Sequence, residues 1–103
     1  MAGARRRARA IALKTLYEID STRHKAEDVL NRLLVDAGLS EKNSAFIREL
    51  VSGISKNRQE IDQNIKKFAT AWPIEQIPAV DRNILRLAIF ELLIDNKIPV
   101  KVA

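Results

Sequence analysis

Helical periodicity runs through almost the whole chain and limits its fold more than any other feature. Apolar residues recur at spacings of three and four in successive stretches, whereas the alternation that is typical of strands is almost absent. A chain of 103 residues is long enough for one domain with one core. The pattern therefore predicts an all-α bundle of about five helices.

Caps and breakers indicate where these helices begin and end. Gly38 is typical of the residue just past a helix, Ser40 is a favourable N-cap, and Pro73 ends the helix before it. Asn57 and Glu60 have the spacing of a capping box. We expect helices over residues 4–19 and 24–37, after Ser40, from Asn57 to Trp72, and over residues 79–96. Gly53 falls inside the third of them, where it permits close helix packing or marks a bend.

The fifth helix is apolar almost all round from Ile84 to Ile94. Neighbours must therefore cover most of its circumference. Either the four amphipathic helices surround it, or another chain or a missing C-terminal segment does so. Phe68 and Trp72, one turn apart on the preceding helix, are expected in the core.

The net charge of +5 is confined to the first 14 residues, which hold five cations and no acid, while the remainder holds 13 basic and 13 acidic side chains. A cationic end on a neutral body indicates a polyanion partner, although a solvated tail is the alternative. Arg5 and Arg9 share the side of the helix that carries Leu16. We therefore expect the first turns to extend beyond the body of the domain, with the arginines projecting.

The cations of the first helix are the candidate RNA-binding residues. Arginine presents a planar fork of donors that suits phosphate and base edges. The predicted RNA-binding residues are Arg5, Arg6, Arg7, Arg9 and Lys14. Tyr17 either stacks on a base or packs in the core, and its place on the apolar stripe favours the core.

Enzyme chemistry has little support in the sequence. There is no cysteine, His24 is the single histidine and is expected at the surface, and no spacing resembles a zinc site. Three scattered glycines cannot form a phosphate-binding loop. We expect no catalytic site, metal or cofactor. The first dozen residues lack an apolar stretch, and residues 84–94 are too short to span a bilayer, which predicts a cytoplasmic protein without a membrane partner.

Three segments together carry a resemblance to a known family. They are ARRRARAIALKTLY at residues 4–17, FIRELVSGI at 46–54 with Ile61 and Asp62 following, and VDRNILRLAIFEL at 80–92 with IPVKVA at 98–103. No single segment is decisive, but their order and spacing are specific. The chain resembles the NusB family of bacterial transcription antitermination factors.

The resemblance implies a single NusB-like domain, residues 1–103, of two small helical bundles, here 1–56 and a partial 57–103. It implies binding of single-stranded boxA RNA in ribosomal-RNA transcripts, together with the ribosomal protein NusE, in the transcription elongation complex. The arginine run maps onto the family's RNA contacts, and Asp81 and Arg82 map onto its protein-partner surface. Arg86 and Glu91 also match, and we interpret them as packing or internal pairing residues.

NusB proteins continue past the VKVA segment with two further helices that pack on the fourth and fifth. Without them the C-terminal bundle is incomplete. We therefore expect the fifth helix to be buried by a second copy of the chain or by rearrangement, which makes a homo-oligomer one of the expected assemblies.

Two other functions remain open at this point. One is the RNA-recruiting domain of a ribosomal-RNA cytosine methyltransferase, whose catalytic domain would lie elsewhere. The other is a helical DNA-binding regulator, with Gly38 and Ser40 in the turn between two helices. The helix after that turn carries mixed charges with no net sign, which makes it a poor reader of a DNA groove.

Overall fold

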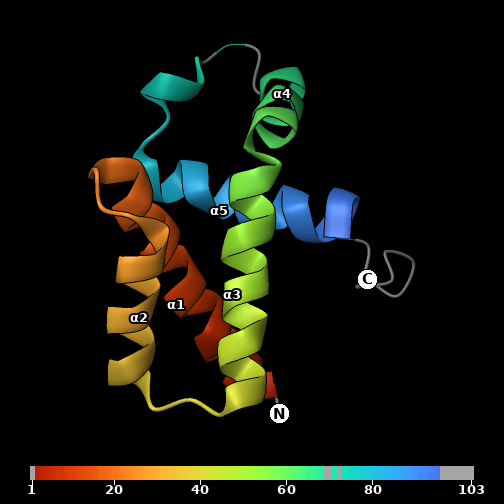
Figure 1. The fold of residues 1–103 in the computed structure, drawn as a ribbon. Helices are drawn as coiled ribbons and strands as arrows, with labels where there is room; N and C mark the ends of the chain where they lie inside the picture. Colours follow the sequence, from red (N-terminus) through yellow and green to blue (C-terminus); the bar gives the residue numbers. More distant parts are fainter. Residues whose placement is uncertain (1, 69–70, 72, 96–103) are drawn as a thin grey trace. The chain divides into compact units, whose positions relative to one another are not determined.

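The computed structural model describes residues 2–68, 71 and 73–95. The elements are α1 (Ala2–Ser21), α2 (Ala26–Ala37), α3 (Glu41–Lys56), α4 (Arg58–Phe68), the 3-10 turn η1 (Ile74–Gln76), α5 (Ala79–Ile89) and the π-helical turn η2 (Phe90–Asp95) (Figure 1). No strand occurs in these ranges, so the all-α prediction is confirmed. The chain divides into two compact units, called here the N-terminal unit (residues 1–52) and the C-terminal unit (residues 53–103).

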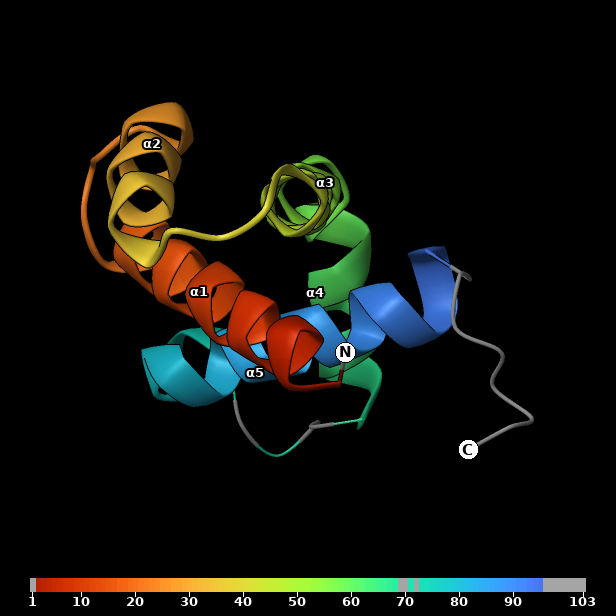
Figure 2. The ribbon, with the colours of Figure 1, turned by 90° about the horizontal axis from the view of Figure 1, so that it is seen from below.

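In the N-terminal unit, α1 and α2 lie side by side, as two perpendicular views show (Figures 1 and 2). The buried apolar residues of α1 recur at spacings of three and four, which places them on one stripe of the helix. The buried apolar residues of this unit are Ala8, Ile11, Ala12, Leu16, Val29, Leu30, Ile47, Leu50 and Val51. Thr15 is also fully buried, and its hydroxyl donates to the Ile11 carbonyl at 2.9 Å, so its polar atom is satisfied.

Two of the expected helix signals, Gly38 and Ser40, are confirmed. Gly38 follows α2 with φ of 63°, a left-handed conformation that favours glycine. Ser40 precedes α3, and its hydroxyl accepts the Asn43 backbone N–H at 3.2 Å. The capping box at Asn57 is wrong. The Asn57 carboxamide donates back to the Gly53 carbonyl at 2.8 Å instead of capping α4, although the Asn57 carbonyl accepts the backbone N–H of Ile61 and so opens that helix.

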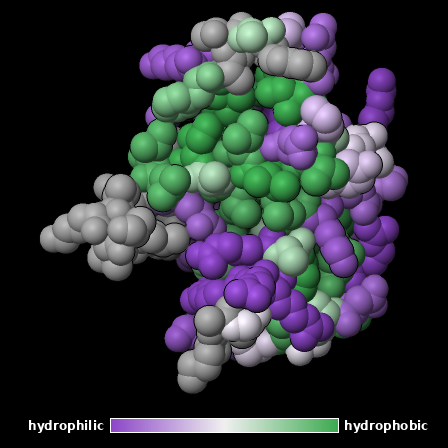
Figure 3. Space-filling model, turned by 180° about the vertical axis from the view of Figure 1, so that it is seen from behind, coloured by the Kyte–Doolittle hydropathy of each residue, from purple (hydrophilic) through white to green (hydrophobic). Residues whose placement is uncertain are grey.

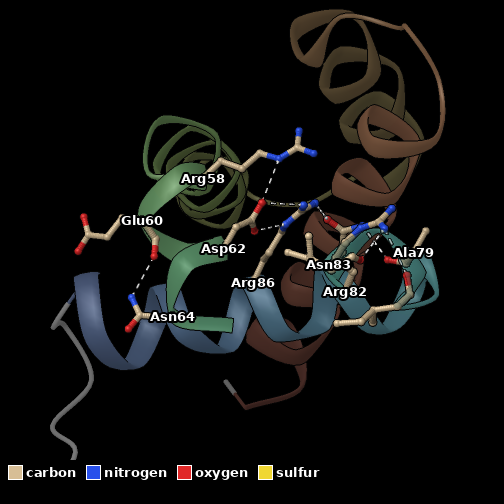
Figure 4. A network of polar contacts seen from close by, with 10 residues as sticks. Arg58, Glu60, Asp62, Asn64, Ala79, Arg82, Asn83 and Arg86 are labelled. Atoms are coloured by element: carbon tan, nitrogen blue, oxygen red, sulfur yellow. Dashed lines mark hydrogen bonds and ion pairs between the residues drawn. The ribbon is translucent and has the colours of Figure 1, made fainter. Parts of the chain in front are cut away.

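The C-terminal unit is built on the packing of α4 against α5. Its buried apolar residues are Ile54, Ile61, Ile65, Ile74, Leu87 and Phe90. Arg86 is only 4% exposed, and its guanidinium donates to both Asp62 carboxylate oxygens at 2.9 and 3.1 Å (Figure 4). A bidentate pair of this kind offsets the cost of burying the charge. The internal pairing expected of Arg86 is therefore confirmed.

Gly53 allows a close approach inside the C-terminal unit. A Cβ atom placed on Gly53 would overlap the ring of Phe90 and would lie 2.7 Å from its Cε1 atom. Phe90 is itself 6% exposed, so its ring has little freedom to move away. Of the two roles expected for Gly53, close packing is the one that the structure supports.

The fifth helix differs from the expected continuous helix over residues 79–96. It is α-helical to Ile89 and then widens into the π-helical turn η2. Hydrophobic residues, drawn in green, form a patch on the face shown in Figure 3. On α5 and η2 the exposed ones are Val80, Ile84, Leu85, Leu92 and Leu93. Within the C-terminal unit, α4 therefore leaves these side chains of the fifth helix uncovered.

Phe68 was expected in the core, and this prediction is wrong. Phe68 is the last residue of α4, and its side chain is 79% exposed. Its stripe neighbours Ile61 and Ile65 are buried, so the packing ends one turn before the helix does. Trp72, expected beside it, lies outside the described residues. Over the described ranges, no helix has the length and apolar character that a membrane span requires.

Candidate nucleic-acid interface

One face of α1 is a continuous exposed stripe opposite the buried one. Its residues recur at spacings of three and four, and they are Gly3, Arg6, Arg7, Ala10, Lys14 and Tyr17. From Arg6 to Tyr17 the stripe is about 16 Å long, at about 1.5 Å per residue. Three of the five predicted RNA-binding cations therefore lie on one accessible surface, which we call the α1 stripe.

Arg5 and Arg9 lie elsewhere, against α3. Both are half-buried, and their Cζ atoms lie 3.8 Å and 5.6 Å from the centroid of the Phe46 ring. The expected projection of these two arginines is therefore wrong. Sequence reasoning overlooked that a planar guanidinium can stack on an aromatic face, which makes partial burial tolerable without a carboxylate.

Arg7 has a structural contact as well as an exposed position. Its Nη2 atom donates to the backbone carbonyl of Ala37 at 2.8 Å. Ala37 is the last residue of α2, where carbonyl groups lack partners within the helix and a cation complements the helix dipole. Arg7 and Lys14 also line a hollow of about 360 Å³ beside α2, with Asp36 among its other lining residues.

The first turns of α1 keep their positive charge. Within the described part of the chain, no ion pair joins Arg5, Arg6 or Arg7 to a carboxylate. Helix α1 begins at Ala2, so these arginines belong to an ordered helix and not to a solvated tail. Arg6 is exposed and donates to no residue that the structure describes. The arrangement leaves cations on an ordered helix where a polyanion can reach them.

Tyr17 does not pack in the core. Its side chain is 45% exposed, whereas the adjacent Leu16 is 5% exposed. The two differ because one residue turns the helix by 100°, which moves Tyr17 onto the α1 stripe. The core interpretation is therefore wrong, and an aromatic face remains accessible beside Lys14.

The far end of α1 carries a polar cluster for which the sequence has no signal. Glu18 pairs with Arg32 of α2, and its Oε2 atom lies 2.8 Å from Nδ1 of His24. These contacts, first of all the hydrogen bond with His24, hold the pKa of the Glu18 carboxyl below its ordinary value. Glu18, His24 and Arg32 line a hollow of about 260 Å³ together with Asp28 and Val29. His24 is exposed, as expected.

The two residues predicted for a protein partner have different surroundings. Asp81 is exposed in the first turn of α5, where an acid complements the helix dipole. Arg82 is half-buried, and its Nη1 atom donates to the carbonyls of Ile74 and Ile77, both at 3.2 Å (Figure 4). Arg82 thus holds the η1 turn onto α5. Across the described ranges, no group of three histidine or acidic side chains is arranged to hold a metal ion.

Known proteins share the sequence pattern of this chain. The model of a family described as the NusB family matches residues 6–103. This chain belongs to the NusB family. The transcription antitermination protein NusB of Dehalococcoides mccartyi is 50% identical over all of this chain and 72% of its own length. The NusB protein of Chloroflexus aggregans is 43% identical over 98% of this chain and 69% of its own length.

Solved structures agree with the NusB assignment. A NusB structure from T. maritima is 34% identical and superposes with a TM-score of 0.84, over 95% of this chain and 69% of its own. A chain in the crystal structure of a plectonemic RNA supercoil is 27% identical with a TM-score of 0.85, over 96% of this chain and 73% of its own. The NusB relatives are named as antitermination proteins, so the family is one of transcription factors rather than enzymes.

Proposed function

We propose that this chain is an RNA-binding transcription antitermination factor of the cytoplasm. Its ligand is single-stranded RNA of the boxA type in ribosomal-RNA transcripts, and it acts with NusE in the transcription elongation complex. The observation that carries the proposal is the α1 stripe, where Arg6, Arg7 and Lys14 lie exposed on one helix face. Family membership and the RNA in the description of one structural neighbour support it.

The stripe suits a single strand in two ways. Its cations neutralise phosphates without reading the base sequence, which fixes the position and direction of the RNA. Tyr17 lies at the end of the stripe and offers an exposed ring, and such a ring stacks on an unpaired base whatever its identity. A strand along α1 therefore meets phosphate contacts first and a stacking platform after them.

NusE is the proposed protein partner, and Asp81 is the proposed contact residue. The Asp81 carboxylate is exposed, which a partner requires. Arg82 takes a smaller part in this proposal, because its guanidinium already donates to two carbonyls of its own unit.

The proposal is tested by charge reversal on the stripe. The variant is Arg6→Glu with Lys14→Glu, which leaves the Arg7 contact with α2 in place. The matched control is Arg23→Glu with Lys25→Glu, which changes the net charge equally at two exposed cations after α1. Binding of a boxA-type RNA oligonucleotide is measured by fluorescence anisotropy over a series of salt concentrations, with and without NusE.

We expect the stripe variant to lose most of its RNA affinity and the control to lose little. Each lost phosphate contact lowers the slope of log K against log salt by about 0.7 for a single strand, so the stripe variant should lose about 1.4. Equal losses in the two variants would mean that only net charge matters, and the proposed site would then be wrong.

A further inference from the structure

Phe46 connects the arginine-rich start of α1 to α3. The half-buried ring has Arg5 over it at 3.8 Å and Arg9 near it at 5.6 Å, measured from each Cζ atom to the ring centroid. All three residues belong to the N-terminal unit. A cation over an aromatic face is attracted by the ring quadrupole, so the contact holds the guanidinium without an opposite charge.

We propose that Phe46 is a positioning residue of the RNA site, and this inference rests on the proposed function. Arginine side chains lose considerable rotamer freedom when a ligand orders them. Stacking on Phe46 orders Arg5 before RNA arrives. The stack uses the face of the guanidinium, whereas its N–H donors lie in the plane and point outward from the edge.

A neutral side chain at position 46 matters because it leaves the positive charge of Arg5 in place. A carboxylate at position 46 would also hold Arg5, but it would cancel part of the field that attracts a polyanion. Phenylalanine holds the cation and leaves its charge in place. Arg7 follows the same logic on the other side of α1, where it is held by the neutral carbonyl of Ala37. The start of α1 is therefore held on two sides without neutralisation.

Arg5 also has an unmet hydrogen-bonding need. Its Nη1 atom is buried and donates to no acceptor in the described structure. A buried donor without an acceptor is costly, and the cost is larger for a charged group. Because Nη1 is enclosed, an anionic ligand would reach Arg5 through its other guanidinium nitrogens.

The experiment compares two substitutions at one position in the full chain. Phe46→Leu keeps an apolar side chain and removes the ring, whereas Phe46→Trp keeps a ring with a stronger quadrupole. Affinity for the same single-stranded RNA is measured by anisotropy, and thermal melting reports the fold. We expect Phe46→Leu to weaken RNA binding roughly threefold to tenfold, which is the cost of ordering one rotamer-rich side chain on binding, and Phe46→Trp to restore it.

A double-mutant cycle with Arg5→Gln separates positioning from a general loss of packing. If Phe46 acts through Arg5, Phe46→Leu costs much less RNA affinity in the Arg5→Gln background than in the wild type. Should Phe46→Leu fail to fold, a normal affinity of Arg5→Gln alone would overturn the inference. Two further results would overturn the inference and leave the proposed function intact. In the first, Phe46→Leu binds RNA as tightly as the wild type. In the second, Phe46→Leu and Phe46→Trp weaken binding equally. If the wild type binds no RNA, the proposed function itself fails.

Discussion

The five cations of α1 do not share one role. Arg6 and Lys14 are exposed on the stripe, Arg7 caps α2, and Arg5 and Arg9 contact the Phe46 ring. The sequence identified all five as a basic cluster, but it could not separate them, because each role depends on a residue from another helix. The one available signal was that Arg5 and Arg9 share the side of Leu16, a position that requires an aromatic or acidic neighbour.

Glu18 supplies a prediction for acid stability. The pKa of its carboxyl is lowered in the folded chain, so its contribution to the free energy of unfolding is full above the unfolded pKa and is lost as pH falls through the folded one. We expect the stability lost in Glu18→Gln, relative to wild type, to be largest near neutral pH and to shrink below about pH 4.3, the ordinary glutamate value. Urea unfolding at several pH values measures this difference.

The control for Glu18 is Glu75→Gln, which removes an exposed carboxylate in the η1 turn. Its effect over the same pH range gives the baseline for loss of an exposed carboxylate. A Glu18→Gln effect that stays constant from neutral to acid pH would contradict the ion-paired state described for Glu18.

At the scale of the helices, local signals predicted most boundaries and failed where tertiary contacts decide. Gly38 and Ser40 act through their own backbone and hydroxyl groups, so the sequence alone located them. The π-helical turn after Ile89 has no local signal, and Asn57 bonds back to Gly53 although its spacing to Glu60 matches a capping box. Gly53 was noticed in the sequence, but only the Phe90 ring beside it explains why a side chain is excluded there.

Gly53→Ala is expected to destabilise the chain although alanine is the better helix former. Alanine gains about 1 kcal/mol in a helix interior, but a methyl group forced against the buried Phe90 ring costs typically 1–3 kcal/mol. We expect a net fall of up to about 2 kcal/mol in the free energy of unfolding. Gly3→Ala is the control, because a Cβ there meets nothing within 4 Å. Chemical denaturation measures both. If the free energy of unfolding of Gly53→Ala equals or exceeds that of Gly3→Ala, the contact between Gly53 and Phe90 is contradicted.

At the scale of the whole molecule, the family and the all-α class were predictable from helical period and motif order, whereas the packing within each unit was not. The chain spans 72% of the length of its Dehalococcoides mccartyi relative. Self-association through α5 and η2 stays a prediction, motivated by exposed apolar side chains such as Leu92 and Leu93.

Sedimentation tests that prediction. We expect the average mass of the wild type to rise with concentration, and Val80→Asp with Leu93→Asp to lower it to that of a monomer. Val35→Asp is the matched control, because Val35 is 81% exposed on α2 and lies outside the proposed contact. A wild type that stays monomeric at high concentration, or a control that acts like the double variant, would count against self-association.

The most direct test of the central claim is the salt dependence of wild-type binding to single-stranded RNA. Four phosphate contacts, three from the cations of the α1 stripe and one from Arg5, predict a slope of about −3 in log K against log salt, at about 0.7 per contact. A slope near that value, reduced by reversal of Arg6 and Lys14, supports an interface built on the α1 stripe. A slope near zero would contradict it, because RNA held without phosphate neutralisation releases no counterions.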